Sequence, residues 1–152
     1  MSFKIEHRVG VPAPPEVLWD LVSDLSGWAA WTPLYPAAAG RLAIGAKLDV
    51  TLALPGGKPE PIAPVVVDWV PHMQLVWRLK LLGGLLRTVR YMEIEPLDNG
   101  RASVFSHGEM FEGPAAMFMP KALRRQIKVG FIAMSEALQG EALRRAGAAA
   151  SS

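Results

Sequence analysis

Alternating apolar and polar side chains near the start of the chain predict a β-strand. In residues 3–9, FKIEHRV, the side chains of Phe3, Ile5, His7 and Val9 alternate with charged ones. This period of two residues is typical of a strand with one covered face.

The pattern changes over residues 12–27, where apolar residues recur at helical spacing. Prolines stand where the first turn of a helix tolerates them, and Gly27 follows the last apolar position. We therefore expect an amphipathic helix. A short helical turn should follow, with Trp28 and Trp31 on one face, and end near Pro33.

The strand period returns at residues 47–54, where apolar residues stand at every second position. Residues 55–64, PGGKPEPIAP, are rich in Pro and Gly and predict a long loop without regular structure. Four further strands are expected at residues 65–70, 73–81, 85–95 and 101–111, which the turn sequences PH, GG and DNG separate.

A long C-terminal helix is expected from Pro114 to about Ala146. Its apolar residues recur at spacings of four, four, three and four: Leu123, Ile127, Phe131, Met134 and Leu138. This helix is the only predicted element long enough to cover one face of a meandering antiparallel sheet, so the expected fold class is α+β. We expect one domain over residues 1–146 and a flexible tail over residues 147–152.

The turn sequences also predict the register of three strands. If Asn99 and Gly100 form a two-residue turn, Arg90 faces Glu109 and Met92 faces His107. The same treatment of the GG turn places Trp77 beside Arg90 and Leu75 beside Met92. The shared face then carries Leu75, Trp77, Leu79, Met92, Ile94, Phe105 and Phe111, and we expect it to be covered.

Three polar residues, Arg90, His107 and Glu109, fall on this same apolar face. One explanation is a satisfied ion pair between Arg90 and Glu109 that stacks against Trp77. The other is that sheet and helix leave a wet or ligand-filled cavity, in which a few polar groups orient an apolar molecule. The residues alone leave both explanations open.

Other chemistry finds less support in the sequence. His107 and Glu109 are candidates for a general acid–base pair, but no Ser, Cys or Lys nucleophile accompanies them in a signature spacing. No second pair with metal-ligand spacing, phosphate-binding loop or dinucleotide fingerprint occurs. We therefore expect neither a metal nor another cofactor.

Composition excludes several classes of partner. The 152 residues include no cysteine, and 16 basic against 14 acidic side chains leave a formal charge of +2, which does not favour nucleic acid. No apolar run approaches the roughly 18 residues that cross a bilayer, and the start of the chain has no apolar signal core, so we expect a cytoplasmic protein without stable membrane insertion. Lys121, Arg124, Arg125 and Lys128 form a basic stripe on the last helix, a pattern usual for a solvated face and rarer for a membrane or partner surface.

The order of these segments resembles the START-like helix-grip superfamily, specifically its group of polyketide cyclases/dehydrases and lipid-transport proteins. VPAPPEVLWDLVSDLSGWAAWTP resembles the first helix and aromatic second helix of that group. VPHMQLVWRL, RYMEIEPLDNGRASVFSHGEMFEG and the C-terminal segment resemble its Pro-then-Trp strand, its last hairpin and its gripping helix. The resemblance implies a curved antiparallel sheet around a long helix, with an elongated apolar cavity between them and two small helices closing one end.

The resemblance implies a function in binding a lipophilic small molecule with an acidic or carbonyl end. Trp28 or Trp31 would wall the mouth of the cavity, or both would plug the junction between sheet and helices. Many members carry a histidine where this chain has Arg90, a permanent cation that favours a carboxylate of Glu109 or of a ligand. The expected lining residues are Trp31, Leu75, Trp77, Arg90, Met92, Phe105, His107, Glu109, Phe131 and Met134.

Two other functions stay open at this point. A cyclase, dehydratase or hydrolase would use His107 and Glu109 beside a bound substrate. The resemblance to co-chaperone activators with the same fold implies an interaction module instead. Fold does not decide among these functions, because function belongs to the site.

Overall fold

The computed structural model describes the chain from Ser2 to Ser151, with side chains through residue 147. The first strand, β1 (Ser2–Val11), confirms the predicted alternation, and three helical pieces follow it: α1 (Pro15–Ser23), η1 (Leu25–Gly27) and α2 (Trp28–Trp31). The remaining strands are β2 (Ala37–Ala39), β3 (Asp49–Leu52), β4 (Glu60–Ile62), β5 (Val65–Val70), β6 (Gln74–Leu81), β7 (Leu86–Leu97) and β8 (Ala102–Glu112). The 3-10 turns η2 (Leu82–Gly84), η3 (Asp98–Gly100) and η4 (Pro114–Phe118) precede the last helix, α3 (Lys121–Ser151).

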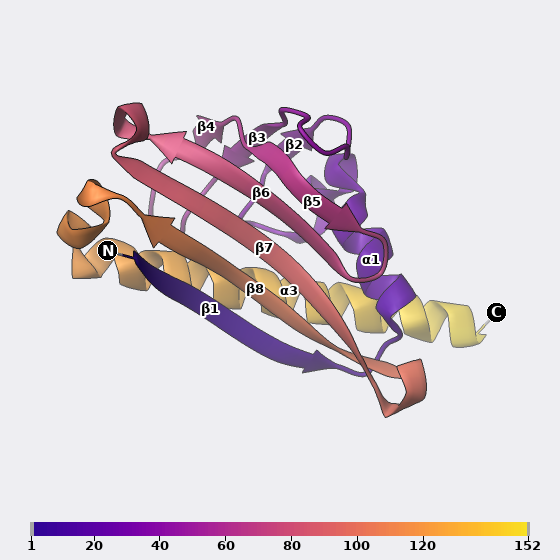
Figure 1. The fold of residues 1–152 in the computed structure, drawn as a ribbon. Coiled ribbons are helices and arrows are strands. Elements are labelled where there is room, and N and C mark those ends of the chain that lie inside the picture. The colour runs from indigo at the N-terminus through magenta and orange to yellow at the C-terminus, as the bar shows by residue number, and fades with distance from the viewer. Residues whose placement is uncertain (1, 152) are drawn as a thin grey trace.

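Five strands form one antiparallel sheet in the order β1-β8-β7-β6-β5, and α3 runs along one face of it (Figure 1). The strands β5 to β8 follow one another as hairpins, whereas β1 joins the sheet beside β8, from the opposite end of the sequence. The structure confirms the predicted α+β class: a sheet that is not closed, a long C-terminal helix and short helices after the first strand.

Both predicted registers are confirmed. Arg90 pairs with Glu109 across β7 and β8, and Trp77 pairs with Arg90 across β6 and β7. The turns themselves are longer than the two-residue form that the sequence predicts. In each hairpin, the last paired residues before the turn lie one pair further from its tip than expected. Asp98 and Leu82 adopt left-handed backbone angles in addition to the residues expected to do so, with φ of 52° and 55°. The longer turns keep the predicted alignment of the strands that they connect.

A second sheet has three strands in the order β2-β3-β4. An isolated bridge between Lys47 and Val65 links the segment before β3 to β5 of the first sheet. β3 lies within the predicted strand at residues 47–54, and β2 was not predicted. The expectation of no regular structure over residues 55–64 is wrong for Glu60–Ile62, which pair with β3. The short strand escapes sequence reasoning because Glu60 and Pro61 have a low strand propensity and Ile62 alone is too short a signal, whereas pairing with β3 stabilises all three residues as a strand.

Helix α3 buries the face that its periodicity predicts. Ile127, Phe131, Met134 and Leu138 are buried, and Leu123 packs at the edge of the core. The helix begins at Lys121 rather than near Pro114, because residues 114–118 form η4. It continues to Ser151, beyond the end expected near residue 146. The flexibility of the tail and the domain boundary at residue 146 stay predictions. In the part of the chain that the structure describes, no helix is long and apolar enough to cross a membrane.

Candidate functional site

The predicted site residues gather between the sheet and α3. Strands β6, β7 and β8 contribute seven of them and α3 contributes two, and each of these nine side chains belongs to a residue at most 4% exposed: Leu75, Trp77, Arg90, Met92, Phe105, His107, Glu109, Phe131 and Met134. The tenth, Trp31, is half-buried on α2. The turn-derived registers therefore place three polar residues inside the apolar interface, as the sequence predicts.

Arg90 forms a buried ion pair with Glu109. Its Nη2 donates to Glu109 Oε1 over 2.8 Å, and its Nη1 donates to the hydroxyl of Tyr35. Burial alone lowers the pKa of Arg90, but the charge of Glu109 and the contact with Tyr35 outweigh it, so the pKa is raised overall. The guanidinium is a cation at every physiological pH, held from two sides.

The aromatic neighbours of Arg90 differ from the predicted one. Its guanidinium carbon lies 5.2 Å from the ring centre of Phe131 and 5.7 Å from that of Tyr35. The stacking of the ion pair on Trp77 that the sequence suggested is not the arrangement found, although Trp77 stands opposite Arg90 in the register. Trp77 instead packs edge-on against Tyr35, with ring centres 5.9 Å apart.

Tyr35 is the residue of this cluster that sequence reasoning missed. It follows α2 in an irregular segment between two prolines, where no periodicity marks a buried position. Its ring also packs on Trp28 at 4.9 Å, and burial raises the pKa of its hydroxyl to about 12. Tyr35 thus connects the small helices to the polar cluster and stays protonated.

His107 is fully buried, and neither of its ring nitrogens has a hydrogen-bond partner. The imidazole lies 4.2 Å from the ring centre of Phe131 and 6.1 Å from that of Phe105. Burial lowers the pKa of His107 well below its ordinary value, and the positive charge of Arg90 and the proximity of His7 lower it further. His107 is therefore a neutral imidazole at pH 7, with one N–H donor and one acceptor nitrogen free.

Other polar atoms at this interface are also without partners. They are Arg90 Nε, Thr88 Oγ1 on β7 and Ser135 Oγ on α3. Ser135 lies one helical turn after Phe131, on the face of α3 that meets the sheet. Native proteins rarely leave buried polar atoms unpaired, so such a group points to water or a ligand.

The two tryptophans of α2 have different environments. Trp28 is fully buried and its indole N–H donates to the main-chain carbonyls of Leu21 and Val22, both at 3.1 Å. Trp31 is half-buried and packs against the core. Trp28 therefore fastens α2 to α1, and a position at the mouth of a cavity stays a prediction for Trp31.

His7 and His107 are paired across β1 and β8, although they are 100 positions apart in the sequence. The sequence did not predict this neighbourhood, because it did not predict that β1 pairs with β8. Within the described residues, no group of three or more His, Cys, Asp or Glu side chains is arranged to hold a metal ion.

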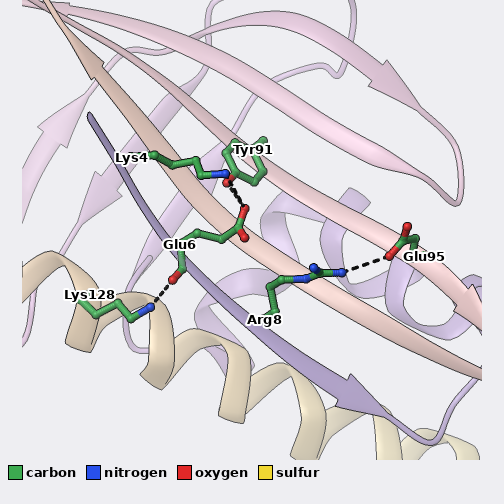
Figure 2. A network of polar contacts seen from close by, with 6 residues as sticks. All are labelled: Lys4, Glu6, Arg8, Tyr91, Glu95 and Lys128. Carbon is green, nitrogen blue, oxygen red and sulfur yellow. Dashed lines mark hydrogen bonds and ion pairs between the residues drawn. The ribbon is translucent and has the colours of Figure 1, made fainter. Parts of the chain in front are cut away.

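The opposite face of the sheet carries a separate polar network, which Figure 2 shows. Tyr91 extends across Gly108 and donates its hydroxyl to Glu6, while Lys128 reaches from α3 to the main-chain carbonyl of Glu6. The hydrogen bond from Tyr91 is the main cause of a lowered pKa at Glu6. A hollow of about 460 Å³ beside this network is lined largely by charged and polar residues, Arg8 and Glu95 among them. Its polarity does not suit a lipophilic molecule.

The sheet, the gripping helix and the buried cluster between them define a START-like helix-grip protein. Residues 2–139 match the family described as polyketide cyclase/dehydrase and lipid transport, and the chain belongs to this family. No curated protein sequence matches the chain.

Three solved structures illustrate the range of proteins with this fold. The Zhui aromatase/cyclase from Streptomyces sp. R1128 is 17% identical with a TM-score of 0.78, and the match covers 96% of both chains. A START superfamily protein from Mycobacterium smegmatis is also 17% identical, with a TM-score of 0.72 over 93% of this chain and 97% of that one. Norcoclaurine synthase from Thalictrum flavum, in complex with dopamine and hydroxybenzaldehyde, is 16% identical, with a TM-score of 0.70 over 95% of this chain and 88% of that one. These likenesses show the fold alone.

Proposed function

We propose that the protein binds a lipophilic small molecule with an acidic or carbonyl end between the sheet and α3. The observation that carries this proposal is the imidazole of His107, which is fully buried with both ring nitrogens unpartnered. An unpaired polar group in a protein interior costs about 1–3 kcal/mol. A ligand oxygen at His107 would remove that cost.

The surroundings of His107 favour a particular ligand chemistry. Most of the buried residues between the sheet and α3 are aliphatic or aromatic, whereas the unpaired groups include the N–H of Arg90 Nε and the hydroxyl of Ser135. Donors of this kind pair with a carbonyl or carboxylate oxygen. A largely apolar lining with a few convergent polar groups is typical of small-molecule sites.

The comparisons support a small-molecule role. The family description covers both cyclase/dehydrase chemistry and lipid transport, and the norcoclaurine synthase structure holds two aromatic molecules with polar substituents. A cytoplasmic location is consistent with this role and stays a prediction.

A substitution at His107 separates a ligand role from a packing role. His107→Leu replaces the unpaired imidazole with an apolar side chain of similar size, so it should raise the stability of the ligand-free protein while weakening ligand binding. Binding is measured by fluorescence titration with cis-parinaric acid, which has a carboxylate, and with 1-aminoanthracene, which has none. We expect His107→Leu to weaken binding of the acid about tenfold and to change binding of the neutral probe much less.

Two results would contradict the proposal. One is that His107→Leu leaves the affinity for each probe unchanged. The other is that the wild type binds neither probe. Native mass spectrometry of the purified protein adds an independent test, because a co-purified lipophilic acid or carbonyl compound supports the proposal directly. Leu123→Met, at the edge of the core, is a matched control that should leave both affinities unchanged.

A second candidate function is a cyclase or dehydratase reaction at the same site. The observation that favours it is the neutral state of His107, since an imidazole with a free acceptor nitrogen can take a proton from a bound substrate. Under this alternative, a bound molecule would lose the mass of water during incubation, and His107→Gln would stop the loss. A mass that stays constant with the wild type favours binding without catalysis.

A further inference from the structure

One end of the molecule exposes four large apolar side chains: Leu82, Leu85, Met117 and Phe118. They are exposed by 67%, 55%, 54% and 81%, and we call them the apolar tip. They belong to two turns, η2 with the residue that follows it and η4. The main-chain N–H of Ala115 joins these turns by donating to the carbonyl of Leu85 over 3.0 Å. Figure 1 shows both turns at the end of the sheet away from the C-terminus.

The two turns present these apolar residues at the surface. Leu82 is two-thirds exposed, and it adopts a left-handed φ of 55°, which is unfavourable for a bulky side chain. Phe118 ends η4, immediately before the start of α3. Soluble proteins seldom gather large exposed apolar side chains without an interaction that covers them.

Positive charge surrounds the apolar tip. Arg87 donates from Nη1 to the carbonyl of Gly84 in η2 over 3.2 Å, and Arg124 donates from Nη2 to the carbonyl of Ala116 in η4 over 3.4 Å. Exposed basic residues flank the turns along the chain: Arg78 and Lys80 before η2, and Lys121 and Arg125 after η4. Residues 69–92 and 113–135, which contain both turns, include no Asp or Glu, and the nearest acidic residue in sequence is Glu112, opposite Arg87 on β8.

We propose that the apolar tip is a peripheral docking site for an anionic lipid bilayer. Apolar side chains that enter the interfacial layer, flanked by cations that meet acidic headgroups, are the two signals that together give reversible membrane binding. A second copy of this chain does not fit, because a two-fold contact through the tip would place each basic cluster against its own copy. The proposal does not depend on what the internal site binds.

Vesicle binding tests the proposal. Wild-type protein is sedimented with vesicles of phosphatidylcholine that contain about one-third phosphatidylglycerol, and with vesicles of phosphatidylcholine alone. We expect at least tenfold stronger binding to the anionic vesicles and a loss of that preference at high salt. Leu82→Ser/Phe118→Ser should weaken binding about tenfold or more without loss of folding, because both side chains are already exposed. Met73→Ser/Leu97→Ser should leave binding unchanged, because it removes exposed apolar side chains at the other end of the sheet, in the β5–β6 turn and at the end of β7.

A single fluorescent label shows whether the tip enters the bilayer. The chain contains no cysteine, so Phe118→Cys provides one site for an environment-sensitive dye, and Met73→Cys provides the control. Anionic vesicles should shift the emission of the dye to the blue at position 118 and leave it unchanged at position 73.

Three outcomes would overturn the proposal. The first is equal binding of wild type and Leu82→Ser/Phe118→Ser to anionic vesicles. The second is binding to polyglutamate as strong as to the vesicles, with no blue shift at position 118, which would indicate an acidic protein partner. The third is a concentration-dependent dimer that the tip substitutions abolish, which would make the tip a contact between copies of this chain.

Discussion

Removing the charge of Arg90 should leave the carboxylate of Glu109 buried without its partner. Both residues are 4% exposed, and the atoms that join them lie 2.8 Å apart. At an effective dielectric constant of about 20, two unit charges at that distance attract by about 6 kcal/mol. This attraction offsets the cost of removing both groups from water, so loss of one partner leaves that cost without compensation.

The expected magnitude follows from this imbalance. Breaking a buried pair by removing one partner costs about 3–5 kcal/mol, so Arg90→Met should lower the free energy of unfolding by that amount. For a chain of this length, such a loss lowers the melting midpoint by roughly 10 °C. Folded domains are stable by about 5–15 kcal/mol, so the variant should still fold and its unfolding can be measured.

Urea unfolding of ligand-free protein is the assay. Arg90→Met and Glu109→Leu should each be strongly destabilised, and the double variant should recover most of the loss, since two apolar side chains of similar volume replace the pair. Arg8→Met is the matched control: its pair with Glu95 is 3.2 Å long but exposed on the outer face, so its loss should cost less than about 1 kcal/mol. If Arg90→Met lowers the free energy of unfolding no more than Arg8→Met does, water reaches Glu109. The description of a buried ion pair that excludes water would then be wrong.

Three further predictions concern other parts of the structure. Gly108→Ala should destabilise the fold by about 1–3 kcal/mol, because a methyl group there would overlap the ring of Tyr91; unchanged thermal unfolding would contradict that packing. Trp28→Phe removes an N–H donor to two main-chain carbonyls of α1 and should cost about 1–2 kcal/mol in urea unfolding. Because the folded-state pKa of His107 is lowered, the unfolded chain binds more protons below about pH 6.5, and stability should fall with decreasing pH by at most about 1.4 kcal/mol per pH unit. His107→Leu should flatten that dependence, whereas His72→Asn at an exposed turn should not; identical slopes in all three proteins would contradict the burial of a neutral imidazole at position 107.

Local sequence patterns predicted most of the large sheet and its covered face. The turn sequences at residues 83–84 and 99–100 determine how β6, β7 and β8 align, and that alignment alone brings Arg90 and Glu109 together. A hairpin register depends on the turn and on neighbouring residues, so it can be derived without knowledge of the rest of the chain.

What the sequence did not predict depends on contacts between distant segments. Tyr35 reaches Arg90 from a segment without periodicity, and the pairing of His7 with His107 requires β1 to join β8 across the length of the chain. The strand at Glu60–Ile62 exists because β3 offers it a partner, against its own composition. In each case a tertiary contact determined the structure and local propensity did not.

The polar cluster is arranged as a set of donors that the protein itself holds in place. A buried ion pair adds little stability compared with apolar side chains of the same size, so the Arg90–Glu109 pair by itself is a weak stabilising feature. Glu109 and Tyr35 nevertheless fix the guanidinium of Arg90 from two sides. The Nε of Arg90 stays unpaired, near the unpaired imidazole of His107. Donors fixed before binding discriminate strongly, because a molecule without an acceptor atom leaves them unpaired at a cost of about 1–3 kcal/mol each. On the proposed function, the same residues that make the interior less stable would select a ligand that carries an oxygen.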